Sequence, residues 1–299
     1  MKKPHIYLIS VFLTILLIFS FLVTGLLVLL RCKGMEPDTS LQIAQDRHLA
    51  QTVHDNLERY FRDQENTTGI PLSVYENAIS VENCDRMIRD SLQNGFSYLN
   101  GRTAKIGNEP DFSALEQDMR AFFEDYADRH KIEKDAGYEL AVKNSLNAAK
   151  QQIISRCDVL RFRTLDDAGV MKKAQRILKW AGFLAVGAGL ISLLLILFLF
   201  MTNHAHGRYG FYWTGCALLI ASVLLLIPSW WLSHTRWFDR FAVKADQIYT
   251  AVTGYLYSMT GAAMIASLCG IAAAVLLLAV FVLLHLRSRK KKLLREVRH

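Results

Sequence analysis

The sequence has few helix-breaking residues and lacks the common signatures of catalytic sites. Only five of its 299 residues are proline and 17 are glycine, which excludes a collagen-like chain and argues against disorder. Its five cysteines form no C-x-x-C pair, and no H-E-x-x-H, G-x-S-x-G or G-x-x-x-x-G-K-[ST] motif occurs. The nine histidines are scattered without metal-ligand spacing. We therefore expect that the protein is not an enzyme and that it binds no metal or cofactor.

An excess of basic over acidic residues is also missing from the largest polar region. Residues 36–170 contain 24 acidic and 16 basic residues, a net charge of −8, although the whole chain carries +8. The basic excess therefore flanks the apolar segments. Nucleic-acid binding loses its compositional support and is not expected.

Four long segments contain no Asp, Glu, Lys or Arg: residues 6–30, 180–201, 211–232 and 261–286. The first would form a helix of about 37 Å, enough to cross the hydrocarbon core of a bilayer. A cleaved signal peptide is the alternative for this segment. However, it is longer than a typical signal h-region, and Arg31 before Cys32 does not suit cleavage there. The pattern predicts an all-α integral membrane protein with four transmembrane helices.

The distribution of basic residues predicts the orientation. With a cytoplasmic N-terminus, ten Lys or Arg residues lie inside, against three in the short outer loop, which favours cytoplasmic N- and C-termini in the cell membrane. Four cations in residues 172–179 oppose this assignment, although long loops obey the rule weakly. The predicted segments are a cytoplasmic N-terminus (1–5), span 1 (6–30), an extracytoplasmic helical domain with its membrane-proximal connection (31–179), span 2 (180–201), a cytoplasmic loop (202–210), span 3 (211–232), an extracytoplasmic amphipathic segment (233–260), span 4 (261–286) and a basic cytoplasmic tail (287–299).

The region between the first two spans has helical periodicity, with little alternation of period two. Four amphipathic helices are expected, with the first running from about residue 38 to Phe61. Ser80 is expected to cap the second, Ser113 the third, and Asp166 with Asp167 the run into span 2. Four such helices predict an antiparallel bundle. For residues 233–260, we expect an interfacial helix or an extension of the last span.

Two cysteines are expected on the inward faces of this bundle. Cys84 and Cys157 either form a disulfide or remain as two buried thiols, and the sequence leaves both alternatives open. A disulfide would close a loop of about 73 residues and contribute about 4 kcal/mol in the chain-entropy model.

Small residues and basic residues form the other two patterns. Small side chains four residues apart predict close helix packing, within the chain or with another subunit, at Ala181, Ala185, Gly189, Ala262, Ala266, Gly270 and Ala274. The tail is expected to hold the C-terminus inside and to bind anionic lipid headgroups through Arg287, Arg289, Lys290, Lys291, Lys292, Arg295 and Arg298.

The order of one span, a large outer domain and three spans resembles the layout of permease subunits that work with a separate ATPase, such as the FtsX/MacB type. This resemblance concerns topology alone. It implies a transport subunit as the alternative function. From the residues themselves, we expect a non-enzymatic membrane protein whose outer helical domain recognises or scaffolds a ligand or a membrane or extracytoplasmic protein partner.

Overall fold

The computed structural model describes residues 4–107, 110–204 and 207–296, with the backbone alone from residue 289 onward. Every regular element within these ranges is helical. The chain divides into an apolar unit (residues 1–34, 178–240 and 256–299) and a polar unit (residues 35–177 and 241–255). The all-α expectation is confirmed for the described residues.

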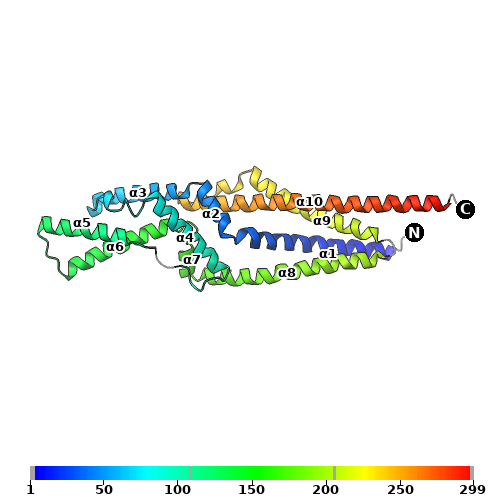
Figure 1. Cartoon of the computed structure of the whole chain (residues 1–299), viewed down its shortest axis with the longest axis horizontal. Coiled ribbons are helices and arrows are strands. Elements are labelled where there is room, and N and C mark those ends of the chain that lie inside the picture. The colour runs from blue at the N-terminus through cyan, green and yellow to red at the C-terminus, as the bar shows by residue number, and fades with distance from the viewer. Residues whose placement is uncertain (1–3, 108–109, 205–206, 297–299) are drawn as a thin grey trace. The chain divides into compact units, whose positions relative to one another are not determined.

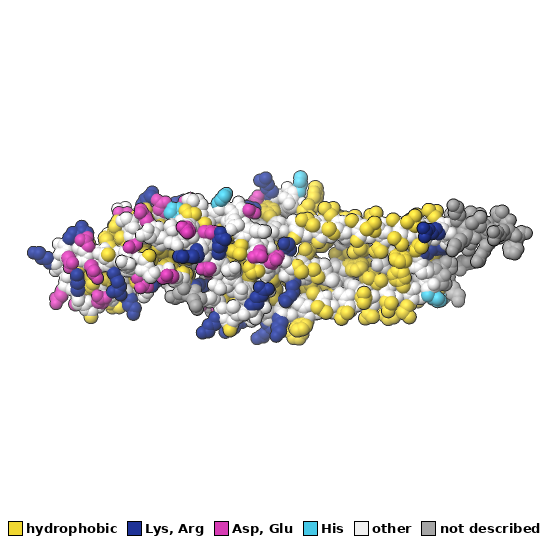
Figure 2. Space-filling view, in the orientation of Figure 1, with side chains coloured by type: hydrophobic (Ala, Val, Ile, Leu, Met, Phe, Trp, Pro, Cys, Tyr) yellow, Lys and Arg dark blue, Asp and Glu magenta, His cyan; other side chains and the backbone are white. Residues whose placement is uncertain are grey.

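The apolar unit contains most of each of the four described helices that are long and apolar enough to cross a membrane. They are α1 (Pro4–Leu29, followed by the π-helical turn η1, Leu30–Gly34), α8 (Val170–Thr202), α9 (Arg208–His234) and α10 (Asp246–Glu296). Figure 2 shows hydrophobic side chains covering this unit. Within the described residues, the expectation of four helices long and apolar enough to cross a membrane is therefore confirmed.

Two of these helices are longer than their predicted spans. Helix α8 begins at residue 170, before the span expected at 180–201, and α10 begins at residue 246, before the span expected at 261–286. The residues that precede each apolar segment include Lys, Arg, Gln and Tyr, which are compatible with a helical backbone. The apolar span therefore ends where these residues begin, but the helix continues through them. The segment 233–260 thus contains a short 3₁₀ turn, η4 (Trp237–Arg240), and the start of α10.

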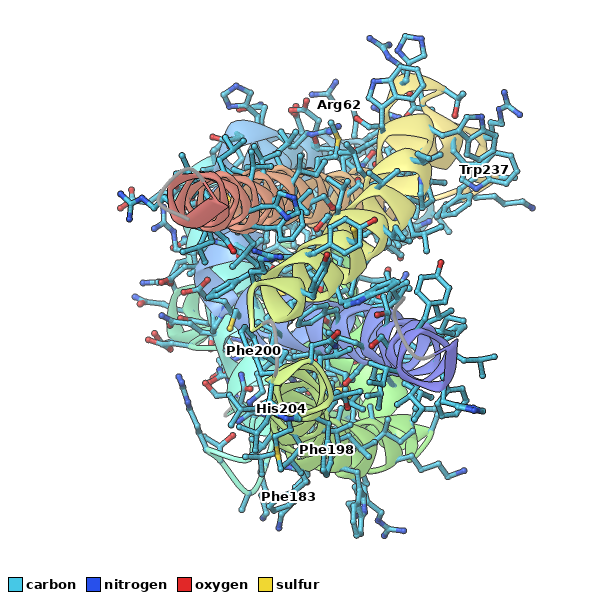
Figure 3. All side chains as sticks on the ribbon, turned by 90° about the vertical axis from the view of Figure 1, so that its right-hand side faces the viewer. Arg62, Phe183, Phe198, Phe200, His204 and Trp237 are labelled. Carbon is cyan, nitrogen blue, oxygen red and sulfur yellow. The ribbon has the colours of Figure 1, made fainter. Side chains whose placement is uncertain are left out.

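Helix α1 packs along α9 and also contacts α8 (Figure 1). Leu17, Leu199 and Ala217 are fully buried at the centre of this packing. The Ser20 hydroxyl lies 3.1 Å from the Ala188 carbonyl oxygen, to which it donates. Such polar contacts help to join helices for which lipid supplies no hydrophobic driving force. Figure 3 shows Phe183 and Phe198 on the outer side of α8, whereas Phe200 lies toward α9.

The polar unit is built from shorter helices. These are α2 (Pro37–Asp46), α3 (Leu49–Thr68), η2 (Leu72–Val74), α4 (Val81–Leu99), α5 (Ser113–His130), α6 (Ala136–Cys157) and α7 (Phe162–Asp167), together with the first turns of α8 and α10. Helix α4 contacts α2, α3 and α6, and α5 pairs with α6 (Figure 1). Charged side chains cover this unit (Figure 2).

The core of the polar unit comes from apolar residues that recur at helical spacing in α3, α4 and α6. Val53, Leu57, Ile88 and Ile153 are at most 1% exposed. Tyr75 is also buried, and its ring stacks on that of Phe61 with the centroids 3.9 Å apart. Burial, with a smaller contribution from the neighbouring Tyr60, raises the pKa of Tyr75 to about 12.

Several helix boundaries differ from the sequence-based expectation. The predicted first helix is divided at His48, which has a positive φ of 49°, so α2 and α3 take different directions. Ser80 caps α4 as expected by accepting from the Asn83 backbone N–H.

At α5, the Asp111 carboxylate accepts from the Ser113 backbone N–H at 2.9 Å, so Asp111 fills the capping role predicted for Ser113. Asp166 and Asp167 end α7 and do not cap α8, because Gly169 with φ 69° separates the two helices.

Candidate functional site

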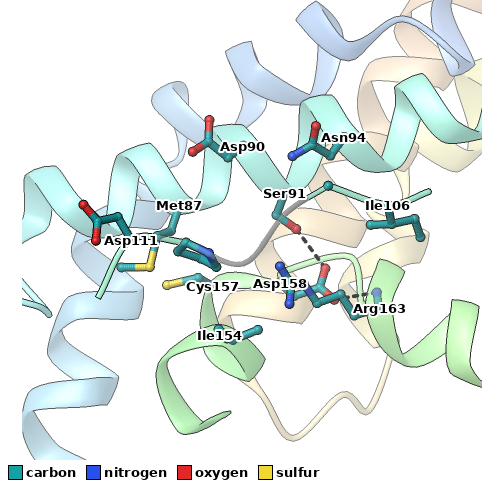
Figure 4. Close-up of a pocket in the computed structure, with 12 residues that line it drawn as sticks. Met87, Asp90, Ser91, Asn94, Ile106, Asp111, Ile154, Cys157, Asp158 and Arg163 are labelled. Atoms are coloured by element: carbon teal, nitrogen blue, oxygen red, sulfur yellow. Dashed lines mark hydrogen bonds between the residues drawn. The ribbon is translucent and has the colours of Figure 1, made fainter. Parts of the chain in front are cut away.

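The polar unit contains a pocket of about 410 Å³ between α4, the end of α6, the start of α7 and the segment preceding α5 (Figure 4). This volume falls within the range of small-molecule sites. Twelve described residues line the pocket: Met87, Asp90, Ser91, Asn94, Ile106, Gly107, Pro110, Asp111, Ile154, Cys157, Asp158 and Arg163.

Asp158 organises one wall of the pocket. It is 4% exposed, and its Oδ1 accepts from the Ser91 hydroxyl at 3.0 Å and from the Phe162 backbone N–H at 2.9 Å. Its Oδ2 accepts from the Arg163 backbone N–H, also at 2.9 Å. The carboxylate therefore caps α7 and joins it to α4. Asp158 therefore holds the pocket wall in place, and its carboxylate oxygens have fewer free acceptor positions for a ligand.

Close packing fixes the same wall from behind. A Cβ atom on Gly95 would lie 2.1 Å from the Phe162 ring, so only glycine permits this approach of α4 to α7. The Phe162 ring is 5% exposed and meets Phe96 edge to face at 5.3 Å between centroids. Asp158 and Phe162 thus hold the short helix α7 in place at both its polar and its apolar contacts.

The rim of the pocket is acidic. Asp90 and Asp111 are exposed there, and the hydrogen bonds that Asp111 accepts from the backbone and side chain of Ser113 lower its pKa. The lowered pKa favours the negatively charged form of Asp111, and Asp90 places a second carboxyl group at the rim. The guanidinium of Arg163 supplies positive charge in the lining. This arrangement suits a ligand with a cationic group and hydrogen-bonding polar atoms.

The structure places Cys84 and Cys157 together, as the inward-facing pattern predicted. They are 0% and 2% exposed and are present as free thiols, and the Cys84 thiol donates to the Ile79 carbonyl oxygen at 3.3 Å. A hydrogen bond with the Cys84 side chain, followed by burial, raises the pKa of Cys157. A raised pKa favours the protonated thiol of Cys157, which is a weaker nucleophile than the thiolate. The disulfide alternative remains a prediction.

A second polar cluster, which the sequence analysis missed, lies on α3. Each of His54, Asp55 and Glu58 offers one potential metal-ligating atom, and these three atoms lie within 4.8 Å of one another. His54 Nδ1 lies 2.7 Å from the Ile79 carbonyl oxygen, while Glu58 is paired with Arg62. The i, i+1, i+4 spacing was the available signal for this cluster. The ion pair with Arg62 already compensates the negative charge of Glu58. We therefore interpret the cluster as a network of hydrogen bonds and ion pairs on the surface of α3.

The predicted small-residue positions have different surroundings. In α10, a Cβ on Gly270 would lie 2.2 Å from the Ser222 hydroxyl of α9, and Ala274 is fully buried near Gly215 of α9. In α8, an added Cβ on Gly189 would meet nothing within 4 Å. The other four are only partly covered or exposed: Ala181, Ala185, Ala262 and Ala266. Ala266 and Gly270 also line a cavity of about 320 Å³ between α1, α9 and α10.

The basic tail is described only in part. Arg287 is exposed on α10. The backbone of α10 continues to Glu296, so the side chains of Arg289, Lys290, Lys291, Lys292 and Arg295 lie outside the described part, as does the whole of Arg298. The prediction of lipid binding by the tail therefore remains a prediction.

Comparisons with protein families, curated proteins and solved structures found no match to this chain. Periodicity identified helices of the polar unit, but Asp90, Asp111 and Asp158 are far apart in sequence and carry no shared motif.

Proposed function

We propose that this chain is a non-enzymatic, multi-pass protein of the cell membrane whose polar unit recognises a ligand or a protein partner outside the cytoplasm. The acidic-rimmed pocket beside Asp158 is the observation that carries the proposal. Its volume and mixture of charged, amide and apolar side chains suit a small cationic molecule or a cationic side chain of a partner protein.

The helix connectivity supports a role in transmission. Helices α8 and α10 start in the polar unit and continue into the apolar unit without an intervening loop. Binding that changes the packing of either helix in the polar unit can therefore alter its membrane segment. A partner subunit packed against Ala181, Ala185 and Gly189 of α8, where an added Cβ on Gly189 meets no atom within 4 Å, would receive this change. The same connectivity would also serve a transport subunit, which remains the second candidate function.

Removal of negative charge at the pocket rim tests the proposal. Asp90→Arg introduces a long cationic side chain at the rim, while Asp63→Arg makes the same charge change at an exposed position on α3. After gentle detergent purification, we expect native protein and Asp63→Arg to retain the same partner or small molecule, and Asp90→Arg to lose it. Equal retention by both variants would contradict recognition through this pocket. A stoichiometric ATPase among the retained proteins would favour the transport function.

The orientation is tested separately with single-cysteine variants. In a background without native cysteines, a membrane-impermeant maleimide should label Lys105→Cys in whole cells and should not label Arg287→Cys. Both positions have exposed side chains, so reactivity reports the compartment. The opposite labelling pattern would place the polar unit in the cytoplasm.

A further inference from the structure

One face of α8 is strongly exposed along the apolar unit. Phe183, Leu190 and Leu197 are 63%, 58% and 54% exposed, while Val186 and Leu193 are 66% and 65% exposed. Residues seven positions apart on an α-helix are separated by only about 20° around its axis. These five side chains therefore form two adjacent columns, which in a bilayer would face the lipid acyl chains.

Each column continues into basic residues at its N-terminal end. Arg176 precedes Phe183 by seven positions, and Lys172 and Lys179 precede Val186 by fourteen and seven. All three cations are exposed on the same continuous helix, and α8 contains no Asp or Glu. Within the described part of the chain, no hydrogen bond or ion pair occupies them.

Aromatic and basic side chains mark the level at which these columns change from apolar to charged. Trp180 is 64% exposed beside Lys179, as expected for a tryptophan at the headgroup region. The guanidinium Nη1 of Arg31, just beyond α1, lies 3.5 Å from the position that a Cβ on Gly182 would occupy. Arg31 therefore lies against α8 one turn from Lys179 and adds another exposed cation at this level.

We propose that Lys172, Arg176 and Lys179, which lie on the one continuous helix α8, form a binding site for the phosphate group of an anionic membrane lipid. The acyl chains would lie along the exposed columns of α8, while the cations contact the phosphate. Arginine can form two parallel hydrogen bonds with phosphate oxygens, and lysine stems can extend along apolar surface toward the headgroup. This site is separate from the C-terminal tail, and it does not depend on recognition by the polar-unit pocket.

The site is tested in the full-length protein with Lys172→Gln/Arg176→Gln/Lys179→Gln. Lys105→Gln/Arg120→Gln/Lys143→Gln is the matched control, because it removes three exposed cations from elsewhere in the polar unit. Both variants also carry Arg287→Gln/Lys290→Gln/Lys291→Gln to reduce binding by the tail. Phosphatidylglycerol or phosphatidylcholine is titrated into detergent micelles, and bound lipid is counted by native mass spectrometry.

Each lost cation is expected to weaken phosphatidylglycerol binding about fivefold, and the three together about 100-fold. The control variant should bind as the protein with the tail substitutions alone. Swapping the cations, by Lys172→Arg/Arg176→Lys/Lys179→Arg, should retain binding and thereby separate charge from folding defects. Equal phosphatidylglycerol binding by the α8 variant and the control would overturn the proposal.

Inorganic phosphate distinguishes a lipid from a soluble ligand. It should not displace phosphatidylglycerol at equal concentration, because it lacks acyl chains that contact the α8 columns. Displacement would assign the cations to a soluble phosphate compound and contradict the lipid proposal. Equal affinity for phosphatidylcholine and phosphatidylglycerol would show that net lipid charge is not recognised, which would also contradict it.

Discussion

Replacement of Asp158 provides a direct test of how the pocket wall is held. Asp158→Ala removes the acceptors for the Ser91 hydroxyl and for the Phe162 and Arg163 backbone N–H groups. Asp158→Asn keeps a similar shape and one acceptor oxygen. Its amide nitrogen, however, cannot accept a hydrogen bond from the second backbone N–H.

The expected loss follows from the burial of each partner. Phe162 is 5% exposed, so an unpaired N–H there costs about 1–3 kcal/mol. The Ser91 hydroxyl and Arg163 N–H belong to half-buried residues, and about 0.5–1.5 kcal/mol is expected for each. Asp158→Ala should therefore lower the free energy of unfolding of the polar unit by about 2–6 kcal/mol. Asp158→Asn should lower it by about 1–2 kcal/mol.

Urea titration of the full chain in mild detergent measures this loss. All five tryptophans lie in the apolar unit, so tryptophan fluorescence reports that unit, while far-UV circular dichroism also detects the polar helices. A loss of about 3 kcal/mol should move the polar-unit transition by about 1–3 M urea. Asp63→Ala, an exposed control, should change stability by less than about 0.5 kcal/mol. An unchanged transition in Asp158→Ala, or a greater loss in Asp158→Asn than in Asp158→Ala, would refute the assigned role.

Three further predictions concern packing and titration in the polar unit. Gly95→Ala should destabilise the polar unit by about 1–3 kcal/mol in the urea titration, because the added methyl group meets the Phe162 ring. Phe162→Leu should relieve part of this loss in the double variant. If the losses of stability in the two single variants simply add in the double variant, the clash is contradicted. Tyr75 should ionise near pH 12 in an absorbance titration. The free energy of unfolding should fall from about pH 10 to 12, because Tyr75 releases its proton on unfolding in this range. If Tyr75→Phe leaves the pH dependence of the free energy of unfolding unchanged, this contribution is contradicted. In reduced protein, Cys84 and Cys157 should react with maleimide only after urea unfolding, whereas rapid labelling of either of these two residues in the native protein would contradict their burial.

The chemical pattern of the sequence determined the four helices that are long and apolar enough to cross a membrane, and most of the shorter helices. Long uncharged segments are compatible with few structures other than membrane-spanning helices, because backbone polar groups in lipid must bond internally. The rows containing Val53, Ile88 and Ile153 also specified the buried faces of the polar unit, because their spacing matches the helical repeat. Cys84 and Cys157 were correctly placed on inward faces by the same periodicity.

Helix ends were less predictable because competing local signals have similar strengths. Asp111 and Ser113 can both accept from a helix N-terminus, and the backbone conformation selects Asp111. His48 adopts a left-handed conformation that its residue type does not require. Likewise, α8 and α10 extend beyond their apolar segments, since hydropathy detects a span and not the end of a helix.

Only the tertiary structure determined which distant residues form the pocket and which small residues permit close packing. Asp90, Asp111 and Asp158 belong to separate segments, and no local periodicity specifies their shared cavity. Gly189 and Gly270 fit equally regular small-residue patterns, yet an added Cβ meets open space at the first and Ser222 at the second. Sequence spacing specifies one face of one helix, whereas a contact also requires the position of a second helix.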